Sequence, residues 1–70
     1  MHSRLVGERL KKLRNQNNLS QQALADRLGI NRSTYSRYES GVIQADYETL
    51  QKIADFYGVS VDYLLVRTDD

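Results

Sequence analysis

Apolar residues recur along the chain at the three- and four-residue spacing of helices, and this pattern predicts five short helices. In the first helix, Val6, Leu10 and Leu13 fall on one face. No stretch shows the sustained alternation of apolar and polar residues that indicates a half-buried strand. We therefore predict an all-α fold in which five short helices surround one core. The predicted helices span residues 3–17, 21–28, 32–40, 47–57 and 61–66.

Capping residues and glycines mark the ends of these helices. A side chain that can accept the first free backbone N–H groups stands at each start, namely Ser3, Ser20, Asn31, Asp46 and Ser60. Three helices end on a glycine, which is expected to take the left-handed conformation while the next residue packs back on the last turn. These ends are Leu28-Gly29-Ile30, Ser40-Gly41-Val42 and Tyr57-Gly58-Val59. The fourth helix is expected to bury Tyr47 together with Leu50 and Ile53.

Residues 20–41 hold the most informative pattern in the chain. Two short helices flank a tight turn at Gly29, and the second turns Tyr35 and Tyr38 toward the core. The opposite face of this helix is polar and basic, with Arg32, Ser33, Ser36 and Arg37. A helix that buries one face and exposes Arg and Ser on the opposite face can lie in a DNA major groove. The segment therefore predicts a helix-turn-helix.

Charge is divided unevenly between the two parts of the chain. Residues 1–44 hold eight Lys and Arg against three acidic residues, an excess of five positive charges. Residues 45–70 hold two against six, an excess of four negative charges. Because the net charge is only +1, the distribution rather than the total favours a basic side that faces phosphates. A chance segregation of solvated charge is the alternative.

The remaining composition limits the class of protein. Seventy residues form one small domain, here residues 1–66, followed by a polar tail at 67–70 that we expect to be flexible. There is no cysteine, no signal-peptide stretch, and no apolar run near the about 20 residues that a membrane helix needs. We therefore expect a cytoplasmic protein without a membrane partner.

Groups for catalysis or metal binding are sparse. The single histidine, His2, has no carboxylate or cysteine at ligand spacing. Because it lies near the N-terminus, it offers no Ser–His–acid arrangement, and the chain has no Gly-rich phosphate loop. We expect no enzyme activity, no metal and no cofactor.

Three segments together resemble the phage repressor and Cro-type helix-turn-helix family, also called the XRE family. They are GERLKKLR at 7–14, LSQQALADRLGINRSTYSRYESG at 19–41 and ETLQKIADFYGVSVDYLL at 48–65. The resemblance covers nearly the whole chain, and it implies a lambda-repressor-like fold. It also implies sequence-specific binding of double-stranded DNA by a transcriptional regulator. A bacterial or phage repressor that binds a two-fold operator as a homodimer is the expected type.

The resemblance assigns roles to individual residues. Base edges would be read by Arg32, Ser33 and Arg37, with Ser36 and Asn31 flanking them. Arg32, at the helix start, could equally bind a phosphate. The expected phosphate contacts are Gln21, Gln22, Ser40 and Gln44. Arg14 and Glu39 match a pair that, in related domains, forms a buried salt bridge between the first and third helices.

The loop after the third helix departs from the family pattern. Family members often have basic residues and a proline there, whereas this chain has Val42, Ile43, Gln44 and Ala45. Fewer phosphate contacts are therefore expected. Ile43 is either core or part of a partner surface, and residues near it, with the fifth helix, are the candidate dimer contact.

The apolar loop and the near-neutral charge leave a second interpretation open. The chain could be a protein-interaction module, such as an antitoxin or adaptor, that keeps the fold with weak or no DNA binding. The outward Arg32 and Arg37 argue against this alternative.

Overall fold

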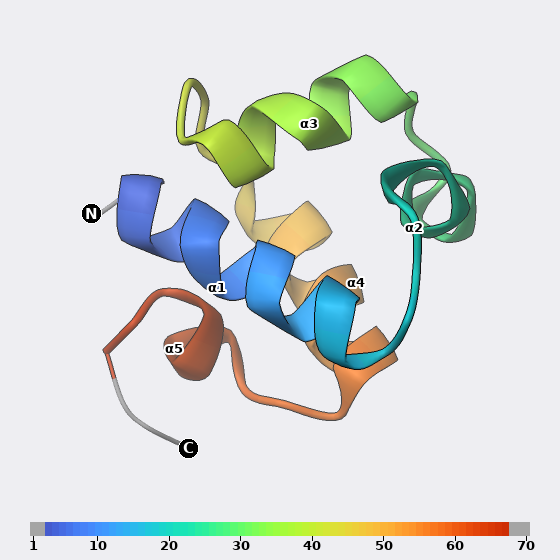
Figure 1. Ribbon diagram of the computed structural model, residues 1–70. Coiled ribbons are helices and arrows are strands. Elements are labelled where there is room, and N and C mark those ends of the chain that lie inside the picture. The colour runs from blue at the N-terminus through green and yellow to red at the C-terminus, as the bar shows by residue number, and fades with distance from the viewer. Residues whose placement is uncertain (1–2, 68–70) are drawn as a thin grey trace.

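Five α-helices make up most of the chain, which is seen here in a computed structural model that describes residues 3–67 (Figure 1). They are α1 (Ser3–Gln16), α2 (Gln21–Leu28), α3 (Arg32–Ser40), α4 (Tyr47–Tyr57) and α5 (Val61–Leu64). The predicted all-α fold is confirmed, and no strand occurs among the described residues. α5 is shorter than predicted because Val66 has a φ of 60°, which is incompatible with a right-handed helix. His2 and residues 68–70 of the predicted tail lie outside the described residues.

Side chains cap the starts of four helices, as predicted. Ser20, Asn31, Asp46 and Ser60 each accept a hydrogen bond of 2.8–3.0 Å from the backbone N–H three residues later. Each bond satisfies an N–H group that a helix start leaves free. The predicted cap at Ser3 is wrong, because Ser3 is the first residue inside α1. Its hydroxyl instead donates to the side chain of Gln44 at 3.3 Å, which joins the start of α1 to the loop before α4.

The three predicted glycine turns are present. Gly29, Gly41 and Gly58 have φ values of 72°, 79° and 70°. The residue after each glycine donates its N–H to the carbonyl five residues earlier. Ile30 and Val59 then pack against the core, as predicted. Val42 does not pack against the core, since 70% of it is exposed. The chain continues from Val42 into a loop, whereas Ile30 and Val59 are each followed directly by the cap of a new helix.

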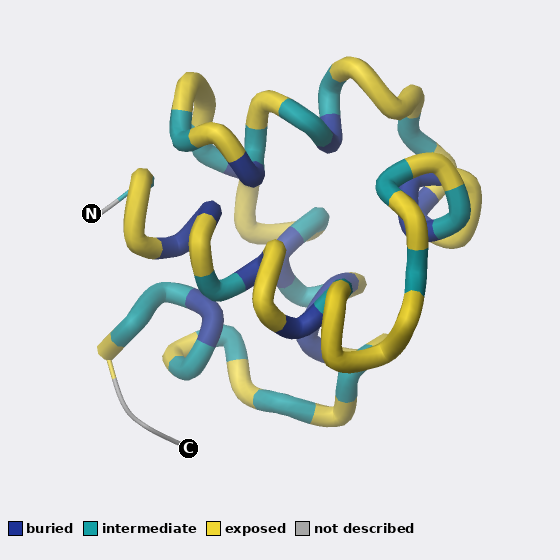
Figure 2. The backbone as a smooth tube through the Cα atoms, viewed as in Figure 1, coloured by how far each residue is buried: buried dark blue, intermediate teal, exposed yellow. Residues whose placement is uncertain are grey.

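The core is formed by the inner faces of all five helices (Figure 2). The buried apolar residues are Val6, Leu10, Leu13, Leu24, Ala25, Leu28, Tyr35, Ala45, Leu50, Ile53, Ala54 and Leu64. The prediction that Tyr47 joins this core is wrong, because 70% of it is exposed. It is the first residue of α4 and lies between the buried Ala45 and Leu50, with its side chain at the surface. Its hydroxyl donates to the side chain of Gln51 at 3.3 Å.

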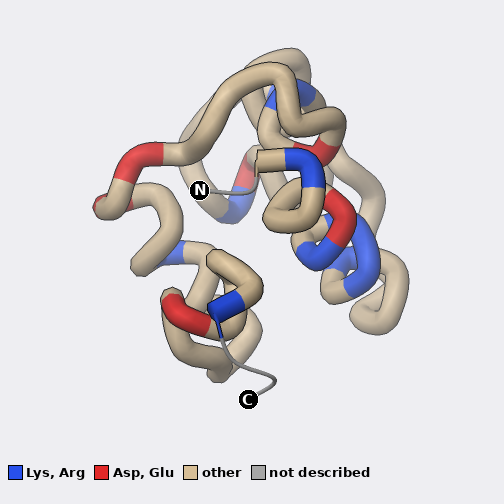
Figure 3. The backbone as a smooth tube through the Cα atoms, turned by 90° about the vertical axis from the view of Figure 1, so that its left-hand side faces the viewer, with Lys and Arg blue, Asp and Glu red and all other residues tan. Residues whose placement is uncertain are grey.

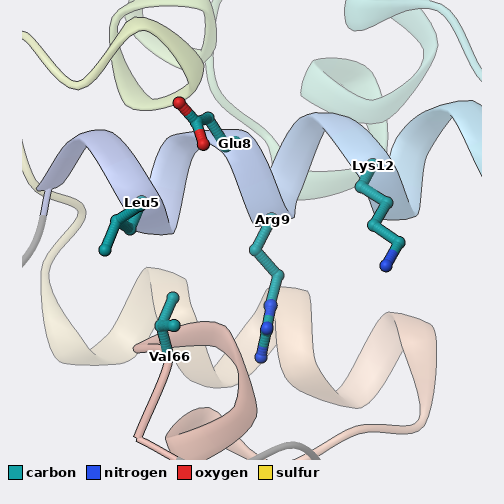
Figure 4. Close-up of a pocket in the computed structure, with 5 residues that line it drawn as sticks. All are labelled: Leu5, Glu8, Arg9, Lys12 and Val66. Carbon is teal, nitrogen blue, oxygen red and sulfur yellow. The ribbon is translucent and has the colours of Figure 1, made fainter.

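Arg9 fastens α5 to α1. Its guanidinium lies 4.2 Å from the centre of the Tyr63 ring and donates to the Tyr63 carbonyl at 2.9 Å. Figure 4 shows Arg9 reaching down from α1, while Glu8 points to the opposite side. Leu5 and Val66 line the same shallow groove, which has a volume of about 190 Å³. α1 is thus held between α3 on one side and α5 on the other (Figure 1).

Candidate nucleic-acid interface

α3 has one buried face and one exposed basic face. Tyr35 is fully buried and Glu39 is only 9% exposed, so this face lies against the protein. Arg32, Ser33 and Arg37 are exposed, and Ser36 is half-buried. The side chains of α3 that are predicted to contact base edges therefore lie together on the part of this helix that faces solvent.

The guanidinium groups of Arg32 and Arg37 are unpaired. Neither forms a hydrogen bond, an ion pair or a ring contact with any residue between 3 and 67. Most Lys and Arg lie in the N-terminal part of the chain (Figure 3), and four of these arginines are engaged within the protein. Those four are Arg4 with Glu8, Arg9 with Tyr63, Arg14 with Glu39, and Arg27 over the ring of Phe56. An unpaired guanidinium keeps all five N–H donors available for an external acceptor.

Short side chains at both ends of α3 bond locally and stay exposed. Asn31 Oδ1 accepts the backbone N–H of Thr34 and the hydroxyl of Ser33, both at 2.8 Å. The Ser40 hydroxyl donates to the Arg37 carbonyl at 3.1 Å. The amide NH₂ of Asn31 and the hydroxyl lone pairs of the two serines are left over for further bonds.

The start of α2 lies against α3. Gln21, the first residue of α2, donates its side-chain amide to Glu39 Oε1 at 3.1 Å. Gln22 is exposed and donates to Asp26 Oδ1 at 2.9 Å. The backbone N–H groups of both glutamines lie in the first turn, where a helix provides no acceptor and favours an anion. The side chain of Gln21 is thus partly occupied, while the helix start itself can still receive a phosphate.

Arg14 and Glu39 form a two-pronged ion pair between α1 and α3. Arg14 Nε donates to Glu39 Oε2 at 2.7 Å, and Nη2 donates to Oε1 at 3.1 Å. The remaining Nη1 donates to the Leu19 carbonyl at 2.7 Å. The two side chains are only 12% and 4% exposed. This is the pair that the resemblance placed between the first and third helices.

The environment of this pair favours both charged forms. Burial alone would raise the pKa of Glu39, but hydrogen bonds from Arg14 and Gln21 outweigh it and hold that pKa below its ordinary value. The hydrogen bond to Glu39 in turn raises the pKa of Arg14. The ion pair therefore persists at neutral pH and links three helices, since Gln21 brings α2 into the same cluster.

Two phenols lie close to the ion pair. The hydroxyls of Tyr35 and Tyr57 are buried, and neither forms a hydrogen bond of regular geometry with a described residue. Burial, together with the nearby negative charge of Glu39, raises the pKa of both groups, that of Tyr57 to about 12. Both phenols are neutral core groups, and neither ring is offered to a base as a stacking surface.

The loop between α3 and α4 is apolar and exposed. Val42 is 70% exposed and Ile43 is 36% exposed, which places Ile43 at the surface. Gln44 is half-buried and accepts the hydroxyl of Ser3, so its side chain reaches toward α1. Like the side chains of Gln21, Gln22 and Ser40, the Gln44 side chain therefore forms a hydrogen bond within the protein.

Two contacts of α1, at Gly7 and at Arg9, were not predicted from the sequence. Gly7 is buried in α1, and a Cβ atom there would lie 2.6 Å from the Tyr38 carbonyl oxygen. A glycine inside a predicted helix was the available signal, because it is unfavourable unless another group comes close. The contact of Arg9 with Tyr63 had no local signal, since the two residues are 54 positions apart.

The remaining described surface offers little other chemistry. Among residues 3–67, no three histidine or acidic side chains are placed to hold a metal ion. No helix in this part of the chain combines the length and hydropathy needed to cross a bilayer. A shallow groove of about 590 Å³ between α4 and α5 is lined partly by Tyr47, Val61 and Leu65.

Comparison with known proteins matches this chain to helix-turn-helix proteins. A family model described as helix-turn-helix matches residues 10–64. The HTH-type transcriptional regulator YonR of the SPbeta prophage in Bacillus subtilis is 48% identical over 64 residues, covering 91% of this chain and 59% of the relative. YqaE, an HTH-type transcriptional regulator from the same organism, is 49% identical over 61 residues, covering 87% of this chain and 53% of the relative. The chain thus spans a little over half the length of these curated relatives.

A solved structure agrees with the fold. The P22 c2 repressor in complex with a synthetic operator matches with a TM-score of 0.80 at 27% identity. The match covers 84% of this chain and 89% of that chain. The predicted lambda-repressor-like fold is confirmed.

Proposed function

The chain belongs to the helix-turn-helix family, and on that premise we propose that it is the DNA-binding part of a transcriptional regulator. It binds double-stranded DNA with α3 in the major groove. The observation that carries the proposal is the pair of exposed, unpaired guanidinium groups of Arg32 and Arg37 on the solvent face of α3. Because regulators of this family act by binding, the chain is not an enzyme.

Base recognition is assigned to the outer face of α3. An arginine can donate two parallel hydrogen bonds to O6 and N7 of guanine, which suits Arg37 and Arg32. Ser33 and Ser36 are short, so they let the helix approach the groove floor and can bond to several bases. The free amide NH₂ of Asn31 can donate to a base edge at the start of the helix.

Phosphate contacts supply affinity and fix the register of α3. The start of α2, with the N–H groups of Gln21 and Gln22, provides donors and the positive end of a helix dipole. Ser40 and Gln44 are the candidates at the other end of α3. The apolar Val42 and Ile43 limit the number of phosphates held, so the affinity should fall with salt less steeply than for a basic loop.

We propose that two copies bind a two-fold operator, because a single helix of nine residues reads few base pairs. Two-fold dimers place their recognition helices on half-sites about 34 Å apart. The apolar surface near Ile43 and along α5, with the groove between α4 and α5, is the candidate contact. Two similar proteins that are named repressors, the P22 c2 repressor and the cryptic phage repressor RstR of Vibrio cholerae, support a repressor role.

Selection of bound sequences from a random duplex pool at moderate salt tests the proposal. We expect one enriched half-site, present as an inverted repeat with centres one helical turn apart or a multiple of it. Enrichment of a half-site without the inverted repeat would refute the proposal that two copies bind together, and it would still support base recognition by α3.

Two other results would replace the proposed function. Salt-sensitive binding with no enriched sequence would indicate a general DNA binder. No binding even at low salt would indicate the protein-interaction module, for which the exposed Val42 would then be the natural contact.

A further inference from the structure

Gly7 lies buried in α1 where α1 meets the last turn of α3. A Cβ atom at this position would overlap the carbonyl oxygen of Glu39 and would lie 2.6 Å from the carbonyl oxygen of Tyr38. Both are backbone atoms of a helix, so neither can rotate away as a flexible side chain would. Glycine is otherwise unfavourable inside a helix, and its position here marks a contact between two backbones.

Arg14 binds the side chain of Glu39, the residue of α3 whose backbone Gly7 meets. Gly7 and Arg14 are seven residues, about two helical turns, apart, so they lie on one face of α1. Gly7 meets the backbone of Glu39, and Arg14 binds its carboxylate with bonds of 2.7 and 3.1 Å. One residue of α3 is thus fixed by α1 at both its backbone and its side chain.

A third close approach lies one turn earlier on α1. A Cβ atom at Gly41, the residue that ends α3, would lie 2.9 Å from the Cα atom of Arg4. The contacts at Arg4 and Gly7 both act on the backbone of the last turn of α3 and of the glycine that follows. The distance between α1 and this end of α3 is therefore set by backbone contact.

We propose that Gly7 is a positioning residue for base recognition, an inference that rests on the proposed function. By allowing the backbones of α1 and α3 to touch, Gly7 sets the distance between α1 and the C-terminal end of α3. Arg37 directly precedes the residues that Gly7 contacts, whereas Arg32 lies at the far end of α3. Gly7 therefore determines where the Arg37 guanidinium meets the bases and has less effect on Arg32.

The size of the effect follows from the contact distances. A methyl group at position 7 must move the last turn of α3 outward by about 1 Å before its contacts reach the ordinary 3.4 Å or more. A hydrogen bond between nitrogen and oxygen spans about 2.7–3.2 Å. A displacement of this size is therefore enough to break a pair of parallel bonds from Arg37 to a guanine.

The test is selection from a random duplex pool with wild type, Gly7→Ala, Arg37→Ala and a matched control, Gly58→Ala. Gly58 has a φ of +70°, so alanine strains the fold there, but nothing lies within 4 Å of the added Cβ atom. Arg37→Ala identifies the base pair that Arg37 reads. We expect Gly7→Ala to reduce the preference at that base pair by about 5- to 150-fold and to keep the others. Gly58→Ala should select the wild-type sequence.

Failure of the proposed function and failure of the positioning role of Gly7 give different results. If the wild type enriches no sequence, the proposed function fails. If it does and Gly7→Ala shows the full wild-type preference at every base pair, the positioning role is wrong. Should circular dichroism show that Gly7→Ala is unfolded, Gly41→Ala decides, because its Cβ atom would press on the backbone of α1 at Arg4, 2.9 Å away, and it has the same left-handed strain as the control Gly58→Ala. We expect Gly41→Ala to weaken the same base preference, and an unchanged preference would overturn the inference.

Discussion

Removing the carboxylate of Glu39 should destabilise the fold far more than removing an exposed carboxylate. In Glu39→Ala, Arg14 keeps only its bond to the Leu19 carbonyl, although its side chain is just 12% exposed. Loss of one partner from a buried ion pair costs about 3–5 kcal/mol, because the other charge stays buried without compensation. A domain of 70 residues has a total stability of roughly 4–10 kcal/mol. The substitution therefore removes a large part of the free energy of unfolding.

The assay is urea unfolding at pH 7 followed by circular dichroism, with Glu8→Ala as the matched control. Glu8 also pairs with an arginine, Arg4, at 2.8 Å, but these side chains are 59% and 76% exposed. Exposed pairs of this kind contribute about 0–1 kcal/mol. Because both variants exchange a helical glutamate for alanine, the difference between them isolates the effect of burial. In thermal unfolding, Glu39→Ala should lower Tm by more than about 12 °C.

A loss in Glu39→Ala of less than about 1 kcal/mol, within the range of the exposed control, would refute this reasoning. It would mean that Arg14 and Glu39 do not hold α3 against α1. The orientation of α3 toward DNA would then have to depend on other contacts between α1 and α3.

Arg37→Ala should weaken binding to the selected duplex by about 1–3 kcal/mol and relax the preference at one base pair, as measured by titration with single-base variants. If the preference is unchanged at every base pair, Arg37 does not contact a base. Val42→Lys should strengthen binding and make log K fall more steeply with log salt by about one unit, whereas an equal slope would show that the loop lies away from phosphate. The lowered pKa of Glu39 predicts that wild type exceeds Glu39→Gln in unfolding free energy by a constant amount well above pH 4.5. That difference should shrink as pH falls through the lowered pKa, because protonation removes the charge that Arg14 binds; urea unfolding from pH 7 to 3 checks this, and a difference that grows on acidification would contradict it.

Local chemistry made most of the fold predictable. Ser20, Asn31, Asp46 and Ser60 cap helices, and Gly29 ends one, because the bonds involved join residues only a few positions apart. The two faces of α3 also follow from helical periodicity alone. The exposure of Arg37 could therefore be predicted from the spacing of Tyr35 and Tyr38.

Most contacts between distant segments could not be predicted from the residues, and the pair of Arg14 and Glu39 was expected only from the family resemblance. Tyr47 has the helical spacing of a core residue, but it is exposed although Ala45 before it and Leu50 after it are both buried. Val42 follows a helix-ending glycine as Ile30 does, yet no new helix begins after it to cover it. The bond from Gln21 to Glu39 depends on how α2 and α3 are placed in space. Propensity and spacing do not encode such placement.

The most direct test of the central claim is a crystal structure of the domain bound to its selected duplex. We predict that α3 lies in the major groove with the Arg37 guanidinium about 2.7–3.2 Å from O6 and N7 of a guanine. A complex in which DNA contacts the α4 and α5 side while Arg32 and Arg37 face solvent would contradict the account.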